Sequence, residues 1–220
     1  MKPKIIFFDV NETLLNLIPL KEEINAALEN EMGFDVWFPK LLHYSLVETS
    51  TGNYQNFSEI AAATFKMISG KFDKNFSDSE IKNILSEITK LPAYPDVKPG
   101  LEQLNDDGYK LVAFSNGKPD ILNAQLEFAE IASFFDGIHS LEEIKKYKPH
   151  PESYRYILKK YEVTPKRSMM VAAHAWDIMG AQRANLQTCF VERPEKKFYD
   201  LAEKPNFWVK EITEIAEKIG

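Results

Sequence analysis

Four short polar segments of this chain carry side chains that are suited to nucleophilic catalysis. They cover residues 9–13, 115–118, 145–149 and 173–177, with the sequences Asp-Val-Asn-Glu-Thr, Ser-Asn-Gly-Lys, Lys-Lys-Tyr-Lys-Pro and Ala-His-Ala-Trp-Asp. Together they offer carboxylates, lysines, and hydroxyl and amide donors. This combination favours a reaction in which a carboxylate attacks the substrate and charge-assisted donors hold the anions that form.

Three of these segments directly follow short apolar runs. The runs are Ile5-Ile6-Phe7-Phe8, Leu111-Val112-Ala113-Phe114 and Met169-Met170-Val171-Ala172, and a fourth run is Thr188-Cys189-Phe190-Val191. Unbroken apolar runs are typical of strands that are covered on both faces. Helical patterns lie between them, for example after Pro151, so an α/β fold with a parallel sheet is predicted. Ligands bind beyond the carboxyl ends of such strands, and the polar segments are therefore expected to meet at one edge.

The stretch between residues 16 and 93 interrupts this alternation, because it contains helix patterns and no convincing strand. Helices are predicted over residues 21–30, 36–49 and 57–69. A fourth is introduced by a capping box, Ser77-Asp78-Ser79-Glu80, and continues through Ile88. The segment Leu91-Pro92-Ala93-Tyr94-Pro95 closes the block. We therefore predict a core formed by residues 1–15 and 94–220 and an inserted helical cap formed by residues 16–93.

The composition excludes several classes of protein. The chain has 220 residues, of which 44% are apolar, and a net charge of −6, which argues against binding to nucleic acid or to an anionic membrane. A single cysteine, Cys189, excludes a disulfide framework. No apolar stretch approaches the ~20 residues of a membrane span, and the first apolar run ends at Asp9, too early for a signal peptide. A cytoplasmic protein is expected.

The polar segments also carry a family resemblance. Asp9 with Thr13, Ser115-Asn116, Lys148-Pro149 and Trp176-Asp177 fall in the order of the four motifs of the haloacid dehalogenase superfamily. The chain resembles the L-2-haloacid dehalogenases most, since these carry Ser-Asn-Gly, Tyr-Lys-Pro and Ala-Trp-Asp where this chain has the same three triplets, ending at Gly117, Pro149 and Asp177. The resemblance implies a Rossmann-like core with an inserted cap, and a homodimer.

The resemblance also implies roles for individual residues. Asp9 would be the nucleophile, Thr13 would orient it, and Lys148 would be the cation that lowers its pKa. Ser115 would bind the substrate carboxylate and Asn116 the leaving halide. Two aromatic residues, Trp176 and Phe57, would line the halide and alkyl pocket. Apart from the resemblance, Tyr154 is either a residue of an amphipathic helix or the source of a further hydroxyl near the site.

Two features expected of the metal-dependent phosphatases in the superfamily are missing. These relatives use an acid two residues after the nucleophile, where this chain has Asn11. They also supply paired acids from the fourth motif, where this chain has Ala172, Ala173 and His174 before Asp177. Since Mg²⁺ requires several hard oxygen ligands, the sequence predicts a metal-free dehalogenase without a cofactor. The alternatives are a phosphatase that binds Mg²⁺ through Asp9 and Asp177, and a non-catalytic module on the same fold.

The chain departs from the dehalogenase pattern too. The arginine that usually follows the cap tryptophan is Phe38 here, which would remove a cation from the halide end of the pocket. The Tyr-Gly of the first motif is replaced by Asn11-Glu12, and Asn11 joins the predicted substrate-binding residues. A Ser-Asn segment before Ala-Trp-Asp is replaced by Ala173-His174. Histidine is suited to general-base work near neutral pH, so we expect His174, oriented by Glu12, to activate water.

These observations together predict a hydrolase that converts short 2-haloalkanoic acids to 2-hydroxy acids. Asp9 attacks the carbon that bears the halogen, and water then hydrolyses the aspartyl ester. Asp177 either holds Lys148 or replaces His174 as the base. The only expected partner is the small 2-haloacid, apart from a second copy of the chain.

Overall fold

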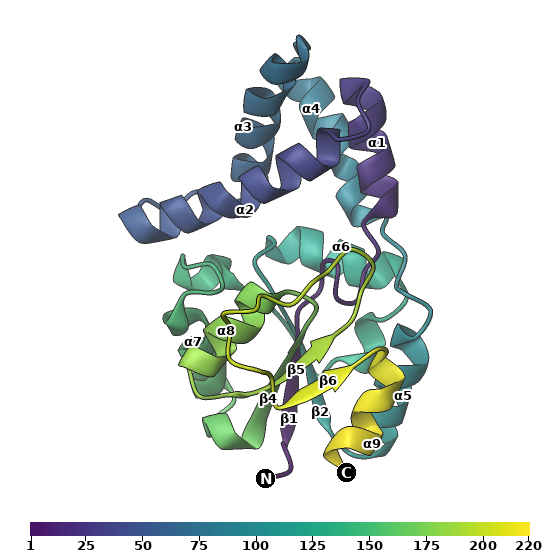
Figure 1. Ribbon diagram of the computed structural model, residues 1–220, viewed down its shortest axis with the longest axis vertical. Coiled ribbons are helices and arrows are strands. Elements are labelled where there is room, and N and C mark those ends of the chain that lie inside the picture. Colours follow the sequence, from purple (N-terminus) through teal and green to yellow (C-terminus); the bar gives the residue numbers. More distant parts are fainter.

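A six-stranded sheet forms the centre of the lower part of the molecule, shown in Figure 1 for the computed structural model, which describes residues 1–220. Its strands are β1 (Ile5–Phe8), β2 (Lys110–Ser115), β3 (Gly137–Ser140), β4 (Ser168–Ala172), β5 (Gln187–Val191) and β6 (Phe207–Val209). They lie in the order β3-β2-β1-β4-β5-β6, and every neighbouring pair is parallel. The predicted α/β fold is confirmed.

The four apolar runs all form strands, and they occupy the centre of the sheet. The two edge strands, β3 and β6, were not predicted. β3 contains Gly137 and His139 and is only partly buried over most of its length, and β6 has three residues with Trp208 exposed. An edge strand is covered less completely than a central one, so its residues need not form an apolar run.

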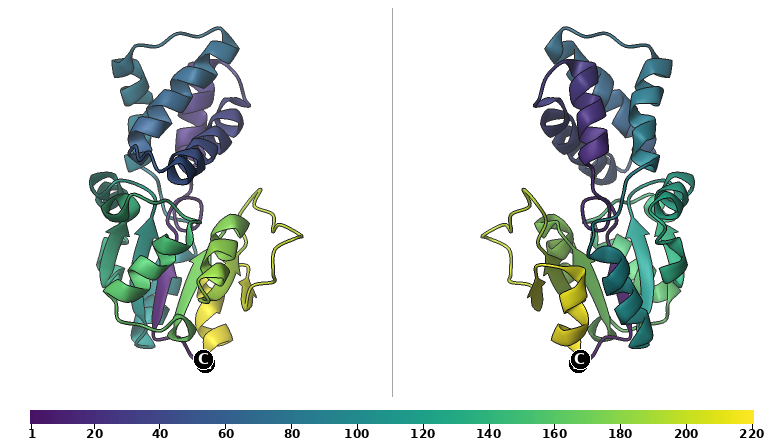
Figure 2. Two further views of the ribbon diagram at one scale, coloured as in Figure 1. Left: turned by 90° about the vertical axis from the view of Figure 1, so that its left-hand side faces the viewer. Right: turned by 90° about the vertical axis from the view of Figure 1, so that its right-hand side faces the viewer.

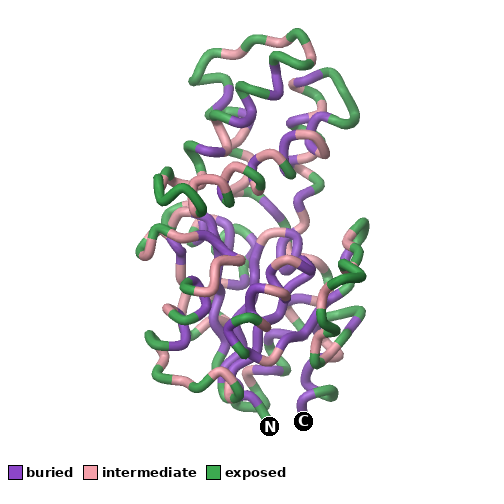
Figure 3. The backbone as a smooth tube through the Cα atoms, turned by 60° about the vertical axis from the view of Figure 1, so that its left-hand side comes forward, coloured by how far each residue is buried: buried purple, intermediate pink, exposed green.

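Helices cover both faces of the sheet, and the alternation of side chains along β1 shows which helix covers which face. Ile6 and Phe8 pack in one cluster with α5 (Val97–Asp106), α6 (Pro119–Phe128) and α9 (Ile215–Ile219). Ile5 and Phe7 pack in a second cluster with α7 (Pro151–Lys160) and α8 (Ala175–Arg183). Burial on both faces explains why this strand is apolar at every position. In Figure 3 the buried backbone is concentrated in this layer.

Four helices stand beyond the carboxyl ends of the strands (Figures 1 and 2). They are α1 (Ile18–Leu28), α2 (Gly33–Thr51), α3 (Phe57–Ser69) and α4 (Asp78–Leu85). The predicted helices overlap all four, and the predicted capping box at Ser77 is present. The last helix ends earlier than predicted, because a 3₁₀ turn, Ser86–Thr89, follows Leu85.

The chain enters and leaves this helical block at one place. Leu15 and Ala93 form an isolated antiparallel bridge, Asn16 N–H donates to the Pro92 carbonyl, and Tyr94 N–H donates to the Leu14 carbonyl. We therefore keep the proposed boundaries of the cap at residues 16 and 93. None of the helices combines the length and the apolar character needed to cross a membrane.

Candidate active site

The strand order brings the predicted polar segments together. β1 lies between β2 and β4, so the loop after β1 is flanked by the loops after these two strands. Asp9 extends the ladder beyond β1, because its N–H donates to the Val171 carbonyl at 3.0 Å. The carboxyl edge of the sheet faces the cap (Figure 1), so Asp9 lies beneath the helical block.

The carboxylate of Asp9 is held by three donors. Lys148 Nζ donates to Oδ1 at 2.8 Å, Thr13 Oγ1 donates to Oδ2 at 2.8 Å, and His174 Nδ1 lies 3.1 Å from Oδ2. Thr13 is itself fixed, because its hydroxyl accepts the N–H of Ala173 at 3.0 Å. Burial disfavours the charged carboxylate, but Lys148 and His174 outweigh it and hold the Asp9 pKa well below its usual range. Asp9 is therefore ionised and oriented, as a nucleophile must be.

Lys148 lies between two carboxylates. Its ammonium donates to Asp9 at 2.8 Å, to Asp177 Oδ2 at 2.6 Å and to the Phe114 carbonyl at 2.9 Å, which uses all three protons. The residue is 1% exposed. Burial favours the neutral amine, but the charges of Asp177 and Asp9 outweigh it and raise the Lys148 pKa. The ammonium therefore stays charged and neutralises part of the acid pair.

Asp177 is oriented by Tyr154 as well as by Lys148. The Tyr154 hydroxyl donates to Asp177 Oδ1, so both carboxylate oxygens of Asp177 have a partner. Gly180 permits this arrangement: a Cβ at this position would lie 2.5 Å from the Tyr154 hydroxyl and 2.6 Å from Pro149 Cβ. Only glycine lets α8 approach α7 this closely, and that approach brings Asp177 to Tyr154.

His174 bridges two carboxylates of the loop after β1. Its Nδ1 lies 3.1 Å from Asp9 Oδ2 and its Nε2 lies 2.9 Å from Glu12 Oε2, and its ring stacks on Trp176 with the centroids 5.0 Å apart. Burial opposes the imidazolium, but hydrogen bonds and charges from Asp9 and Glu12 outweigh it and raise the His174 pKa to about 9. The ring therefore carries a proton at neutral pH while the Asp9 carboxylate is ionised.

Glu12 has an unusual backbone conformation, with a φ of 61° in the left-handed region. For a residue with a Cβ this costs about 1 kcal/mol or more. The conformation aims its carboxylate at His174 and also at Lys196, whose Nζ lies 2.6 Å from Glu12 Oε1.

The predicted substrate-binding residues lie around this centre. Asn116 accepts the Lys148 N–H at 2.9 Å and is 3.4 Å from the Lys148 carbonyl, so its amide fixes the backbone that carries the lysine. The Ser115 hydroxyl accepts the Gly117 N–H at 3.1 Å. The Asn11 side-chain oxygen accepts from Gln125 at 2.8 Å. Binding of substrate by these groups remains a prediction.

The two cap residues of the predicted site occupy different positions. Phe57 begins α3 and meets the Tyr147 ring edge-on, with the centroids 5.6 Å apart. Tyr147 precedes Lys148 in the chain and its hydroxyl donates to the Gln55 carbonyl at 2.6 Å, so it connects the cap to the candidate active site. Phe38 packs within the cap, stacked on Phe34 with the centroids 5.2 Å apart.

Three residues near the centre were not singled out from the sequence, although each contacts a predicted site residue. They are Lys196 on Glu12, Gln125 on Asn11, and Arg193, which donates to the Thr13 carbonyl at 2.9 Å. Only Gln125 had a signal in the sequence, because it is a polar residue on the face of α6 that packs against the core. Nothing in the sequence distinguishes Lys196 from the neighbouring Lys197.

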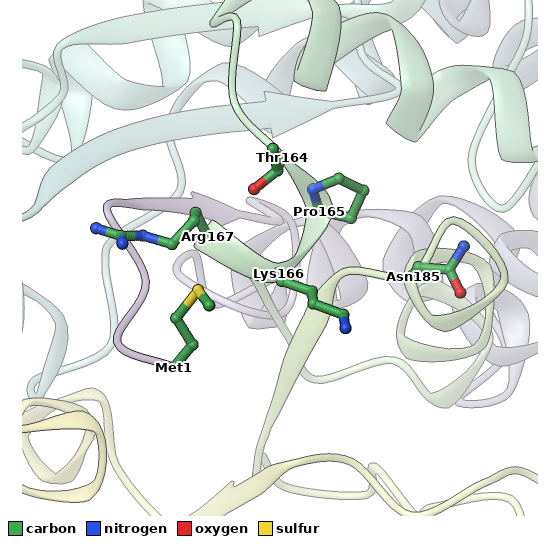
Figure 4. Close-up of a pocket in the computed structure, with 6 residues that line it drawn as sticks. All are labelled: Met1, Thr164, Pro165, Lys166, Arg167 and Asn185. Carbon is green, nitrogen blue, oxygen red and sulfur yellow. The ribbon is translucent and has the colours of Figure 1, made fainter.

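A further hollow lies at the opposite edge of the sheet (Figure 4). It is lined by six residues near the amino ends of β4 and β5, namely Met1, Thr164, Pro165, Lys166, Arg167 and Asn185. None of the predicted site residues contributes to it. Parallel sheets carry their ligand sites at the carboxyl edge, so the centre around Asp9 is the candidate active site.

The donor set around Asp9 does not fit Mg²⁺. Mg²⁺ requires several oxygen ligands in octahedral geometry, whereas Asp9 and Asp177 share the ammonium of Lys148. No group of three or more His, Cys, Asp or Glu side chains has an arrangement that could hold a metal ion. The residues around Asp9 therefore do not form a Mg²⁺ site.

The proton on His174 makes the stability of the fold depend on pH. The folded-state pKa of about 9 exceeds the ordinary value of 6.5, so this stabilisation is complete below pH 6.5 and is lost as the pH rises through 9. At about 1.4 kcal/mol per pH unit, the loss amounts to about 3 kcal/mol. We expect urea titrations to show the unfolding free energy of the wild type falling by this amount over that range, and that of His174→Asn not to. If the unfolding free energies of the two proteins changed equally with pH, the raised pKa of His174 would be contradicted.

Comparison with known proteins identifies the family of the chain. The family model described as haloacid dehalogenase-like hydrolase matches residues 3–185. The chain is 29% identical over 211 residues to (S)-2-haloacid dehalogenase 4A of Burkholderia cepacia, covering 90% of this chain and 89% of the relative. It is 23% identical over 222 residues to haloacetate dehalogenase H-2 of Moraxella sp. (strain B), covering 100% and 99%.

Solved structures show the same fold. The L-2-haloacid dehalogenase of Xanthobacter autotrophicus superposes with a TM-score of 0.91 at 23% identity, over 98% of this chain and 97% of that one. The same enzyme with chloropropionic acid covalently bound gives a TM-score of 0.88 at 23% identity, again over 98% and 97%. The chain therefore belongs to the haloacid dehalogenase-like hydrolases, and it is similar to the (S)-2-haloacid dehalogenases among them.

Proposed function

We propose that this protein hydrolyses short 2-haloalkanoic acids to 2-hydroxy acids through an ester on Asp9. The observation that carries the proposal is the buried Asp9 carboxylate, which Lys148 and Thr13 each hold at 2.8 Å. The cations beside it, Lys148 and His174, lower its pKa. The relatives named (S)-2-haloacid dehalogenase support this substrate class, and so does the related structure with chloropropionic acid covalently bound.

In the first step an oxygen of Asp9 attacks the carbon that bears the halogen. A carbon–oxygen bond forms, the carbon–halogen bond breaks, and the halide leaves with its electron pair. Ser115 and Asn11 hold the substrate carboxylate and Asn116 receives the halide, with Trp176 and Phe57 as apolar walls. Phe38 replaces a cap arginine, so no cation is supplied from that position. The cap excludes bulk water during this step.

In the second step water attacks the ester carbonyl carbon of Asp9. His174, oriented by Glu12 at 2.9 Å, takes the proton of this water. Asp177 is less suited to this role, because Lys148 and Tyr154 occupy its two oxygens and the residue is fully buried. Asp177 instead holds Lys148. A homodimer and a cytoplasmic location are part of this proposal.

The test is a screen for halide release from 2-chloro- and 2-bromoalkanoic acids, run with and without EDTA. We expect release of one halide per hydroxy acid formed and an unchanged rate in EDTA, because a lysine ammonium occupies the position between the two acids. A generic phosphate monoester, with Mg²⁺ added, serves as the comparison substrate. Hydrolysis of this ester together with EDTA-sensitive halide release would contradict the proposal and select a Mg²⁺-dependent phosphatase.

A further inference from the structure

A row of alternating charges connects the protein surface to the nucleophile. Lys196 Nζ is 2.6 Å from Glu12 Oε1, Glu12 Oε2 is 2.9 Å from His174 Nε2, and His174 Nδ1 is 3.1 Å from Asp9 Oδ2. The side chains of Glu12 and His174 are 10% and 8% exposed, while that of Lys196 is 24% exposed. Each inner member of the row therefore has a neighbour of opposite charge on both sides.

The outermost member of this row comes from a separate part of the chain. Lys196 lies on the segment between β5 (Gln187–Val191) and β6 (Phe207–Val209), which projects from the side of the sheet in Figure 2. The Lys196 ammonium lowers the Glu12 pKa, in addition to the larger effect of His174 and against the effect of burial. The Glu12 carboxylate therefore interacts with two cations, His174 and Lys196.

The reaction removes a single charge from this row, that of Asp9. When Asp9 becomes an ester, Lys148 keeps Asp177 as its counter-ion at 2.6 Å. His174 then has only Glu12 as a counter-ion, and Glu12 also pairs with Lys196. The six groups Asp9, Lys148, Asp177, His174, Glu12 and Lys196 are balanced before the attack and carry one excess positive charge after it, once the halide has left.

We propose that Lys196 is a positioning residue that balances Glu12, so that His174 gives up its proton when Asp9 is esterified and only then becomes the base. This inference rests on the proposed function, because it assumes the ester on Asp9. It explains how an imidazolium in the resting enzyme can act as a base later in the same cycle. Without Lys196, the unshared charge of Glu12 would hold the proton on the ring.

The protons balance over the cycle. Attack by Asp9 releases the halide, and His174 then releases one proton to solvent. The neutral ring takes a proton from the attacking water as the oxygen–carbon bond forms at the ester carbonyl. That proton passes to the departing alkoxide to give the hydroxy acid, and the new carboxyl group of Asp9 returns its own proton to His174. The sum is haloacid and water giving hydroxy acid, halide and one proton.

The groups that contact His174, directly or through Glu12, come from three parts of the chain. Asp9 and Glu12 contact it from the loop after β1, Trp176 stacks on it from α8, and Lys196 reaches Glu12 from the segment before β6. Lys148 and Asp177 neutralise one another beside Asp9. The substrate carboxylate is present before and after the attack, so it does not alter the change in net charge around His174.

The first test follows the His174 ring by NMR titration and needs no turnover. Asp9→Asn has nearly the shape of Asp9 without its charge and stands in for the ester. We expect Asp9→Asn to lower the His174 pKa by about two units from its wild-type value. Adding Lys196→Met should raise it again by about one unit, whereas adding Lys196→Arg should not. Lys197→Met is the matched control, since Lys197 is exposed on the same segment, and it should have no effect.

The second test mixes excess 2-bromoalkanoic acid rapidly with enzyme in a weakly buffered indicator solution. We expect the wild type and Lys197→Met to release a proton in step with the first halide. In Lys196→Met the ester should accumulate, as measured by mass spectrometry of the quenched protein. The pH of half-maximal ester hydrolysis should move up by about one unit. Lys196→Arg should restore the wild-type profile.

Three outcomes would overturn the inference. They are an unchanged His174 pKa in Asp9→Asn, equal effects of Lys196→Met and Lys197→Met, and a proton that appears with the hydroxy acid instead of with the halide. Failure of the proposed function has a different signature, because the wild type would then release no halide from any 2-haloacid. In that case the NMR titration still decides whether Lys196 controls the proton on His174.

Discussion

Replacing Asp9 with Asn is expected to lower halide release by about 10⁴-fold or more, because the attacking oxygen is lost and no other group takes its place. Asn retains the shape of Asp, so the fold and the contacts of Thr13 are expected to persist. Asp106→Asn is the control, since Asp106 is exposed at the end of α5 and far along the chain from the site. Halide release by Asp9→Asn at a rate close to that of the control would contradict the role of Asp9.

An isotope experiment tests the same role without a substitution. With enzyme in excess over substrate in ¹⁸O-water, the hydroxyl oxygen of the product comes from Asp9, and the first turnover therefore yields unlabelled hydroxy acid. The label enters the Asp9 carboxylate and is found in the peptide that contains it. Label in the product of the first turnover would show that water attacks the carbon directly.

Replacing His174 with Asn is expected to separate the two steps. Asp9 keeps Lys148 and Thr13 as donors, so about one halide per site is released in a burst. Hydrolysis of the ester then slows by about 10²-fold to 10⁴-fold, the usual contribution of a general base. Glu12→Gln should slow the same step less, because the ring stays in place but its charged partner is lost.

Quenched samples measured by intact mass provide the readout for this prediction. His174→Asn should carry the added mass of the substrate's carboxyalkyl group on Asp9, and the wild type should carry little of it. His43→Asn is the control, since His43 is exposed on α2 in the cap. If His174→Asn turns over steadily near the wild-type rate, or loses the burst together with turnover, Asp177 replaces His174 as the leading base.

The sequence by itself determined the architecture and the position of the candidate nucleophilic centre. The central strands are apolar at every position because helices cover both faces, and this signal is local in the sequence. The polar segments that follow β1, β2 and β4 had to meet because parallel strands place their carboxyl ends at one edge. The pairing of Asp9 with Lys148 and Thr13 follows from those motif positions. Even the contact between His174 and Glu12 follows from the loops that carry them.

Only the tertiary structure decided which further charges surround those residues and which of them carry a proton. Lys196 reaches Glu12 across 184 positions of the chain, and its neighbour Lys197 is equally basic but exposed. The edge strands β3 and β6 could not be predicted from the sequence either, because partly exposed strands need not form an apolar run. The protonation of His174 depends on two carboxylates within 3.1 Å of a buried ring. Coulomb energies vary with distance and burial, and neither quantity can be derived from residue type and spacing.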